Sequence, residues 1–191
     1  MKPGLLNETT ASLGRRVSAA VLGGLLVLTV VAPVAASTVK RDMVWGSGTR
    51  SALDPNSTAP SFELNASSNP DGTNATGTFN FKTLASAWSS QITCLNVKGS
   101  TATMVGRIAT ATGGFDGSQG SYFVQVVQDL GSATKRHPSP DLMSAVSWDT
   151  EAGWNAQGFT LAQLCSDPIG LGALPSGWDY MVSGDLTVID R

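Results

Sequence analysis

Apolar and polar side chains alternate at a period of two residues in several segments of this chain, and this alternation constrains its fold most. In residues 122–127, Tyr122 and Val124 fall on one face of an extended strand, and Phe123 and Val127 fall on the other. Shorter alternations occur at residues 79–82, 92–95 and 185–188. A period of two is typical of half-buried antiparallel strands, so the pattern predicts a mainly β fold.

Turn and helix signals agree with this prediction. Gly99 and Ser100 separate two alternating segments, and glycine supplies the positive φ of a two-residue hairpin turn, so residues 90–98 should pair with residues 101–110. The pattern predicts one short helix, at residues 160–165. The predicted fold is therefore all-β: a single antiparallel β-sandwich or β-barrel of about eight strands, with long loops and at most one short helix.

Three stretches of the chain have an irregular composition. Glycine, serine, threonine, asparagine and proline dominate residues 46–77, which predicts turns and exposed strand edges rather than core. Residues 129–140 and 166–181 are the second and third stretches. We expect residues 37–45 to form a flexible N-terminal arm and residues 46–191 to form the β domain.

The first 36 residues have the parts of a signal peptide. Arg15 and Arg16 precede an uncharged apolar run over residues 17–31, which is short for a bilayer core of ~30 Å. A helix-breaking proline and small residues follow this run. We therefore predict cleavage after Ala36, with cleavage after Ser37 as the competing position.

Two alternatives to this export route stay open. An uncleaved segment would act as a membrane anchor, although the polar residues 40–42 follow it closely. Arg15 and Arg16 also suggest twin-arginine export, but Ser18 and Ala19 stand where that signal prefers bulky apolar residues, which favours the Sec route. The prediction is a secreted, extracellular protein without stable membrane insertion after cleavage.

Composition limits the size and the partners of the mature chain. Removing 36 residues from 191 leaves 155, which is enough for one domain with its own core. Three of the 12 basic residues and one of the 14 acidic residues leave with the signal peptide, so the remaining charge is about −4. The remaining cations are scattered along the chain, which argues against a nucleic-acid partner.

Both cysteines, Cys94 and Cys165, lie after the predicted cleavage site, and an even pair in an exported chain predicts one disulfide bond. Because the two positions are 71 residues apart, loop closure should stabilise the fold by ~4 kcal/mol. The chain has no CxxC motif, and two sulfurs with the single histidine, His137, are too few for a zinc site. No metal or cofactor is predicted.

Short segments in a fixed order suggest a family. They are QITCLNVKG at 91–99, VGRI at 105–108, VVQDLG at 126–131, PSPD at 138–141, Cys165, and GDLTV at 184–188. Over about residues 46–190 the chain resembles a group of small exported bacterial β-rich proteins of unassigned function. The turn at residues 128–131 and the tryptophan-rich residues 143–164 depart from the family pattern. The resemblance implies export, a disulfide and a β-rich fold, and it supplies no catalytic residue.

Two kinds of hydrolase chemistry can be compared with the sequence. A Ser-His-acid set would need His137, which lies in a predicted loop without a Gly-x-Ser-x-Gly turn. Paired carboxylates are the better alternative, since glycoside cleavage needs two acids at a fixed separation. The candidates for such a pair are Glu63, Asp141, Asp149 and Glu151.

Tryptophan side chains supply the candidate binding surface. Trp148 and Trp154 flank a polar stretch that ends in glycine and has the composition of a turn, so at least one indole should lie near the surface. Exposed indoles can stack on sugar rings, and the adjacent Asp149 and Glu151 could accept hydrogen bonds from hydroxyl groups.

The other tryptophans complete this assignment. Trp178 joins the candidate surface because it lies in a predicted loop, whereas Trp88 is expected in the core. The alternative is that the tryptophans fill a core that has few other large side chains. We predict a non-enzymatic extracellular or cell-envelope binding or structural module, whose partner is an envelope glycan or another extracellular protein. A small glycan-active hydrolase stays the alternative.

Overall fold

The structure, a computed structural model, describes residues 40–50, 59–132, 141–174 and 178–191. The chain divides into two units, Met1–Ser37 and Thr38–Arg191. The predicted signal peptide, with its cleavage site at Ala36 and Ser37, lies outside the described residues, as does His137. All of the described residues belong to the second unit.

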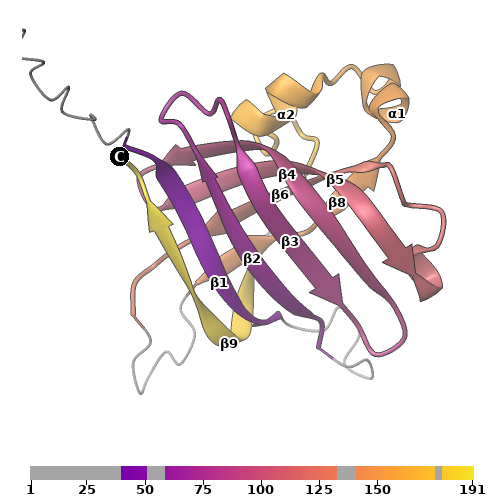
Figure 1. Cartoon of the computed structure of the whole chain (residues 1–191), viewed down its shortest axis with the longest axis horizontal. Coiled ribbons are helices and arrows are strands. Elements are labelled where there is room, and N and C mark those ends of the chain that lie inside the picture. Colours follow the sequence, from indigo (N-terminus) through magenta and orange to yellow (C-terminus); the bar gives the residue numbers. More distant parts are fainter. Residues whose placement is uncertain (1–39, 51–58, 133–140, 175–177) are drawn as a thin grey trace, which may run out of the picture. The chain divides into compact units, whose positions relative to one another are not determined.

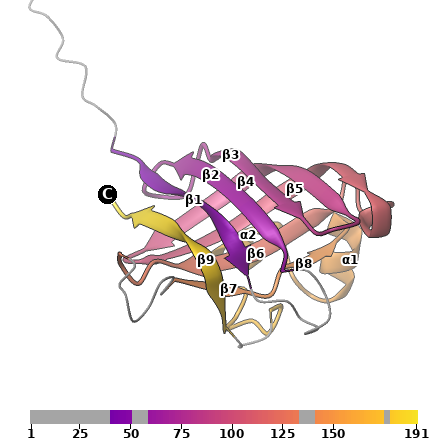
Figure 2. The same cartoon turned by 90° about the horizontal axis from the view of Figure 1, so that it is seen from below.

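Nine antiparallel strands within the described residues form one sheet that curls into a half-barrel (Figures 1 and 2). They are β1 (Asp42–Arg50), β2 (Ser61–Ser68), β3 (Thr76–Lys82), β4 (Ala87–Lys98), β5 (Thr101–Thr112), β6 (Tyr122–Gln128), β7 (Leu142–Ser144), β8 (Ser147–Asp149) and β9 (Trp178–Ile189). The strands β1 to β5 are neighbours in sequence order, and β5 also pairs with β6. The short strand β7 joins β6 to β9, which pairs with β1, while β8 lies beside β6. The predicted all-β fold is confirmed.

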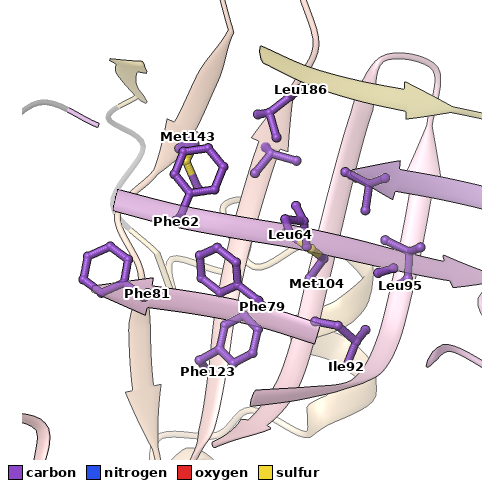
Figure 3. Close-up of a cluster of buried hydrophobic side chains, with 14 of the residues drawn as sticks. Phe62, Leu64, Phe79, Phe81, Ile92, Leu95, Met104, Phe123, Met143 and Leu186 are labelled. Atoms are coloured by element: carbon purple, nitrogen blue, oxygen red, sulfur yellow. The ribbon is translucent and has the colours of Figure 1, made fainter. Parts of the chain in front are cut away.

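Alternate side chains of the strands fill the interior of the curled sheet (Figure 3). Phe62 and Leu64 of β2 lie opposite Phe81 and Phe79 of β3, and all four are buried. The ring centroids of Phe79 and Trp88 are 5.2 Å apart, so Trp88 belongs to the core as predicted. Burial of these large rings stabilises the sheet.

A helical cap covers part of the outer face of the sheet. It consists of α1 (Glu151–Ala156), α2 (Leu161–Ser166) and residues 167–174. Side chains of the cap and of the outer face form a second apolar cluster of buried residues: Val105, Val124, Val126, Trp154, Leu164, Cys165 and Leu174. The strand β6 therefore packs against apolar side chains on both faces, in agreement with the apolar residues that its sequence places on each face. In the described part of the chain, no helix has the length and apolar content that crossing a membrane requires.

The prediction of at most one short helix is wrong, because the cap holds two. The predicted helix at residues 160–165 is α2, where Thr160 and Gln163 form a reciprocal capping box. The additional helix is α1, which begins after Thr150, whose side chain accepts a hydrogen bond from the Gly153 backbone N–H. The polar stretch that suggested a turn between strands is therefore the start of a helix.

The predicted disulfide joins Cys94 of β4 to Cys165 of α2, with a Cα–Cα distance of 6.1 Å. A register shift in the β4–β5 ladder between Ile92 and Cys94 makes this bond possible. Ile92 and Leu95 belong to the interior cluster, whereas Cys94 packs with the cap. The period-two pattern of residues 92–95 predicted that Ile92 and Cys94 lie on the same face of the strand. This prediction is wrong, because the extra residue Thr93 at the bulge moves Cys94 to the other face.

The flexible arm predicted at residues 37–45 is wrong from Asp42 onward, where β1 begins. The strand β1 lies between β2 and β9, and Asp42 Oδ1 accepts a hydrogen bond from the Arg191 backbone N–H (2.9 Å). Gly46 allows β9 to approach closely, since a Cβ there would collide with the carbonyl oxygen of Asp185. The arm was expected to be loose because it directly follows the predicted cleavage site, whereas pairing with β2 and β9 orders it from Asp42 onward.

The other irregular stretches also contain strands. The strand β2 lies within residues 46–77 and buries Phe62, Leu64 and Ala66, so the expectation of turns and edges alone is wrong there. The strand β9 begins at Trp178, inside the stretch predicted to be irregular up to residue 181. The hairpin of β4 and β5 is confirmed, with Gly99 at a φ of 60° in its turn.

Candidate functional site

Trp148 is the solvent-facing end of a series of aromatic rings that starts in the core. It lies in β8 opposite Phe123 of β6, and opposed residues of paired strands share a face. Its ring and that of Phe115 make a T-shaped contact, with centroids 5.6 Å apart and planes at 87°. Phe115 in turn packs on Phe81, at 6.0 Å. The side chain of Trp148 is 40% exposed, so part of the indole is free for a ligand.

Trp148 lines an open depression of about 420 Å³, which we call the Trp148 hollow. Its lining residues are Gly114, Phe115, Asp116, Gly117, Ser118, Ser121, Trp148, Asp149 and Thr150. One wall comes from the connection between β5 and β6, which starts with the 3₁₀ turn η1 (Gly113–Phe115), and the other wall comes from the end of β8. The described residues of this lining include two carboxylates and three hydroxyls but no basic side chain.

Local hydrogen bonds hold the β5–β6 wall in place. Gly113 has a φ of 65°, which lets the chain turn out of β5. The Ser118 hydroxyl donates to the carbonyl oxygen of Phe115 (2.7 Å), and the Ser121 backbone N–H donates to the carbonyl oxygen of Ser118 (3.0 Å). The wall is therefore a bonded turn whose shape does not depend on a ligand.

Asp149 is positioned by the start of α1. Its Oδ1 accepts a hydrogen bond from the Thr150 backbone N–H (2.7 Å), and its Oδ2 accepts one from Gln157 Nε2 (2.8 Å). A Cβ on Gly153 would meet this carboxylate, so the present position of the Asp149 side chain depends on glycine there. An ionised carboxylate has about four acceptor positions, which leaves capacity to accept hydrogen bonds from a ligand.

Trp154 does not belong to the surface, so the prediction for this residue is wrong. It is 2% exposed and lies under α1, with its ring centroid 6.4 Å from that of Phe159. Its Nε1–H donates to the carbonyl oxygen of Tyr122 (3.1 Å), which satisfies the buried donor. Trp154 fixes the cap to β6.

The remaining members of the predicted surface are not brought into the hollow. Glu151 is exposed in the first turn of α1 and does not line the Trp148 hollow. Trp178 begins β9 and is paired with Ser144, but its side chain lies outside the described residues. Trp148 and Asp149 are thus the two predicted residues that the structure places together.

The four carboxylates proposed for a hydrolase lie in different places. Glu63 lies on the outer face of β2, Glu151 is on α1, and Asp149 lines the Trp148 hollow, where the second acid is Asp116. Asp141 is fully buried. None of the other three predicted acids shares the hollow with Asp149, so the set chosen from the sequence does not form a pair there.

Asp141 has a structural role between β7 and β9. Its Oδ1 accepts from the Leu130 backbone N–H (2.9 Å), and its Oδ2 accepts from the Leu186 backbone N–H (2.7 Å). Burial raises the pKa of this carboxyl; these two hydrogen bonds lower it, and the charges of Asp129 and Asp185 raise it further. The carboxylate therefore joins the connection after β6, through Leu130, to β9, through Leu186.

Sequence reasoning missed most of the hollow. Phe115, Asp116, Ser118 and Ser121 come from the glycine-rich connection after β5, and an aromatic residue beside an acid in such a turn was the available signal. It also missed Trp45, which is 37% exposed on β1. Within the described residues, no group of three or more His, Cys, Asp or Glu side chains could hold a metal ion.

Comparison of the chain with protein families, with curated proteins and with solved structures finds no match. The resemblance to small exported bacterial proteins therefore stays a prediction.

Proposed function

We propose that this chain is exported and that its Trp148 hollow binds an uncharged glycan, which makes it an extracellular or cell-envelope binding module. The observation that carries the proposal is the exposed Trp148 indole, packed at right angles to the ring of Phe115 and flanked by hydroxyl and carboxylate acceptors. Sugar rings present apolar C–H faces and polar hydroxyl edges. The hollow offers a matching combination of an aromatic surface and hydrogen-bonding groups.

The charge of the hollow narrows the ligand class. Asp116 and Asp149 can accept hydrogen bonds from hydroxyls, while phosphate or carboxylate groups would meet like charge. An uncharged glycan therefore fits better than an anionic polymer. The same reasoning disfavours nucleic acid, as the overall charge does.

The compartment is supported by two features of the chain. The apolar run and the small residues around Ala36 have the pattern of a cleaved signal peptide. The disulfide between Cys94 and Cys165 is the type of bond that persists in an oxidising environment outside the cytoplasm.

Co-sedimentation with insoluble uncharged polysaccharides tests the binding. The probes are cellulose, xylan, chitin and starch, each mixed with the purified protein and with Trp148→Ala. We expect retention on one of them, with at least about tenfold weaker apparent affinity for Trp148→Ala, because the stacking surface is lost. The control is Leu171→Ala, which removes a cap side chain of similar exposure (39%) that does not line the hollow and should bind normally.

The results separate binding from the alternatives. Equal retention of wild type and Trp148→Ala, or no retention on any probe, would contradict the proposal. The proposal also predicts retention without release of reducing ends. Release that stops in Asp116→Asn or Asp149→Asn would favour a glycan-active hydrolase instead.

A further inference from the structure

The outer face of β1 to β5 carries two rows of side chains that cross the strands. Ser47, Glu63, Asn80, Ser89 and Thr110 are successive partners in β1, β2, β3, β4 and β5. At the usual ~4.8 Å between strands, this row is about 19 Å long. Residues of one row share a face of the sheet, so the row forms a continuous polar strip.

A second row runs beside the first and starts with the exposed Trp45. It continues through Asn65, Thr78, Gln91 and Arg107 on the next four strands. Trp45 is 37% exposed and is the aromatic member of the two rows. We call the two rows together the sheet face.

Two adjoining depressions follow these rows. One, of about 400 Å³, is lined by Trp45 and Asn65 among others, and the other, of about 570 Å³, is lined by Asn80, Ser89 and Thr110 among others. Both include Ser47 and Glu63, so they are continuous. Neither α1 nor α2 lies in front of β1, β2 and β3 in Figure 1, and the view in Figure 2 agrees.

The charges of the sheet face indicate what could cover it. Glu63 is the negative member of the two rows and Arg107 the positive one, so the rows carry no net charge. The other members are Trp45 and seven uncharged polar side chains. Among the described residues, no side-chain hydrogen bond occupies the amides of Asn65, Asn80 or Gln91. Each amide can both donate and accept, as a sugar hydroxyl does.

We propose that this sheet face is a second contact surface for an uncharged polysaccharide chain, which would lie across the strands with a sugar ring on Trp45. The inference takes its ligand class, an uncharged glycan, from the proposed function. It adds that the glycan is a long polymer, because a long polar strip fits an extended chain rather than a short oligosaccharide. Two surfaces on one molecule strengthen binding to a polymer by raising the effective concentration at the second one.

The test compares a polymer with its short fragments. The probes are the insoluble polysaccharide retained in the panel above and its soluble fragments of two or three sugars. We expect Trp45→Ala to bind the polymer at least about tenfold more weakly than wild type, while its affinity for the fragments, held by the Trp148 hollow, is unchanged. The double variant Asn65→Ala/Gln91→Ala, which removes no apolar packing, should weaken polymer binding in the same direction. Leu171→Ala is the control for both.

Each outcome distinguishes the two proposals. If Trp148→Ala loses both ligands but Trp45→Ala and the double variant retain the polymer normally, the sheet face is not a binding surface and the proposed function stands. If Trp45→Ala loses the polymer while Trp148→Ala does not, the sheet face binds and the hollow does not. A wild-type dimer in size-exclusion chromatography that Trp45→Ala converts to monomer, with polymer binding intact, would identify the face as a contact between two copies and overturn the inference.

Discussion

Removal of the disulfide should loosen the helical cap before it affects the rest of the sheet. The double variant Cys94→Ala/Cys165→Ala deletes the bond without leaving a free thiol. The helices α1 and α2 are each six residues long, and helices shorter than about 12 residues are not stable alone in water. Their order therefore depends on the bond and on the apolar cluster beneath them.

The magnitude follows from the length of the closed loop. With a sequence separation of 71 residues, the chain-entropy relation gives a loss of about 4 kcal/mol in the free energy of unfolding. That is a large part of the ~5–15 kcal/mol typical of a domain. For a domain of this size it corresponds to a fall in Tm of about 10 °C.

Thermal unfolding and hydrogen exchange measure the two effects. Amides of residues 151–174 should exchange faster in the variant at temperatures where β2 to β4 stay protected. The control is Asn96→Ala, which removes only the side-chain hydrogen bonds to the carbonyl oxygens of Cys165 (3.3 Å) and Ser166 (3.4 Å) and should cost about 1 kcal/mol. An unchanged Tm, or equal loss of protection in cap and sheet, would refute this reasoning.

Three further predictions concern single positions. Trp154→Ala should lower the free energy of unfolding by about 3–5 kcal/mol, measured by urea denaturation, because it leaves a cavity and removes the hydrogen bond to the Tyr122 carbonyl; a loss under about 1 kcal/mol would contradict its place in the core. Asp141→Asn should destabilise by about 1–3 kcal/mol, since an amide can accept only one of the two backbone hydrogen bonds. The folded pKa of Asp141 is raised above 3.8, so the contribution of this carboxyl to stability is complete at low pH and declines as the pH rises through the raised pKa. The difference in unfolding free energy between wild type and Asp141→Asn should therefore shrink as the pH rises. A difference that grows with pH would exclude a raised pKa for Asp141. N-terminal sequencing of protein from culture medium should begin at Ser37, as cleavage after Ala36 requires, or one residue later for the competing position; recovery only of the uncleaved chain in membranes would contradict export.

Local patterns predicted the parts of the fold that depend on neighbouring residues. The alternation in residues 122–127 identified β6, but it predicted a half-buried strand, whereas apolar clusters cover β6 on both faces. The turn at Gly99 and Ser100 gave the β4–β5 hairpin, because a two-residue loop fixes the register of its strands. The cysteine pair gave the disulfide, since no other partner existed in the chain.

Features that depend on distant contacts could not be predicted in the same way. Gly153 disfavours a helix by propensity, but α1 forms because Thr150 caps its first turn and Trp154 is buried against β6. The bulge at Thr93 is visible only in the pairing of β4 with β5. At Gly153 and Thr93, contacts with distant parts of the chain override the structure that the neighbouring residues favour.

The candidate site was predicted in part for the same reason. Trp148 and Asp149 are neighbours in sequence, so one segment was enough to suggest them. Phe115 and Asp116 lie more than thirty residues earlier, and the pairing of β8 with β6 brings Trp148 beside them. Unless the order of the strands is known, the sequence does not show that the connection after β5 and the end of β8 form one hollow.

Glycan binding at the Trp148 hollow is tested most directly by the indole N–H signals of the protein in ¹⁵N–¹H spectra. The chain has five tryptophans, and single substitutions assign their signals. On titration with soluble fragments of the retained polysaccharide, the Trp148 signal should shift and saturate, while the signals of the buried Trp88 and Trp154 should stay in place. A Trp148 signal that does not move while the fragments bind would contradict the account.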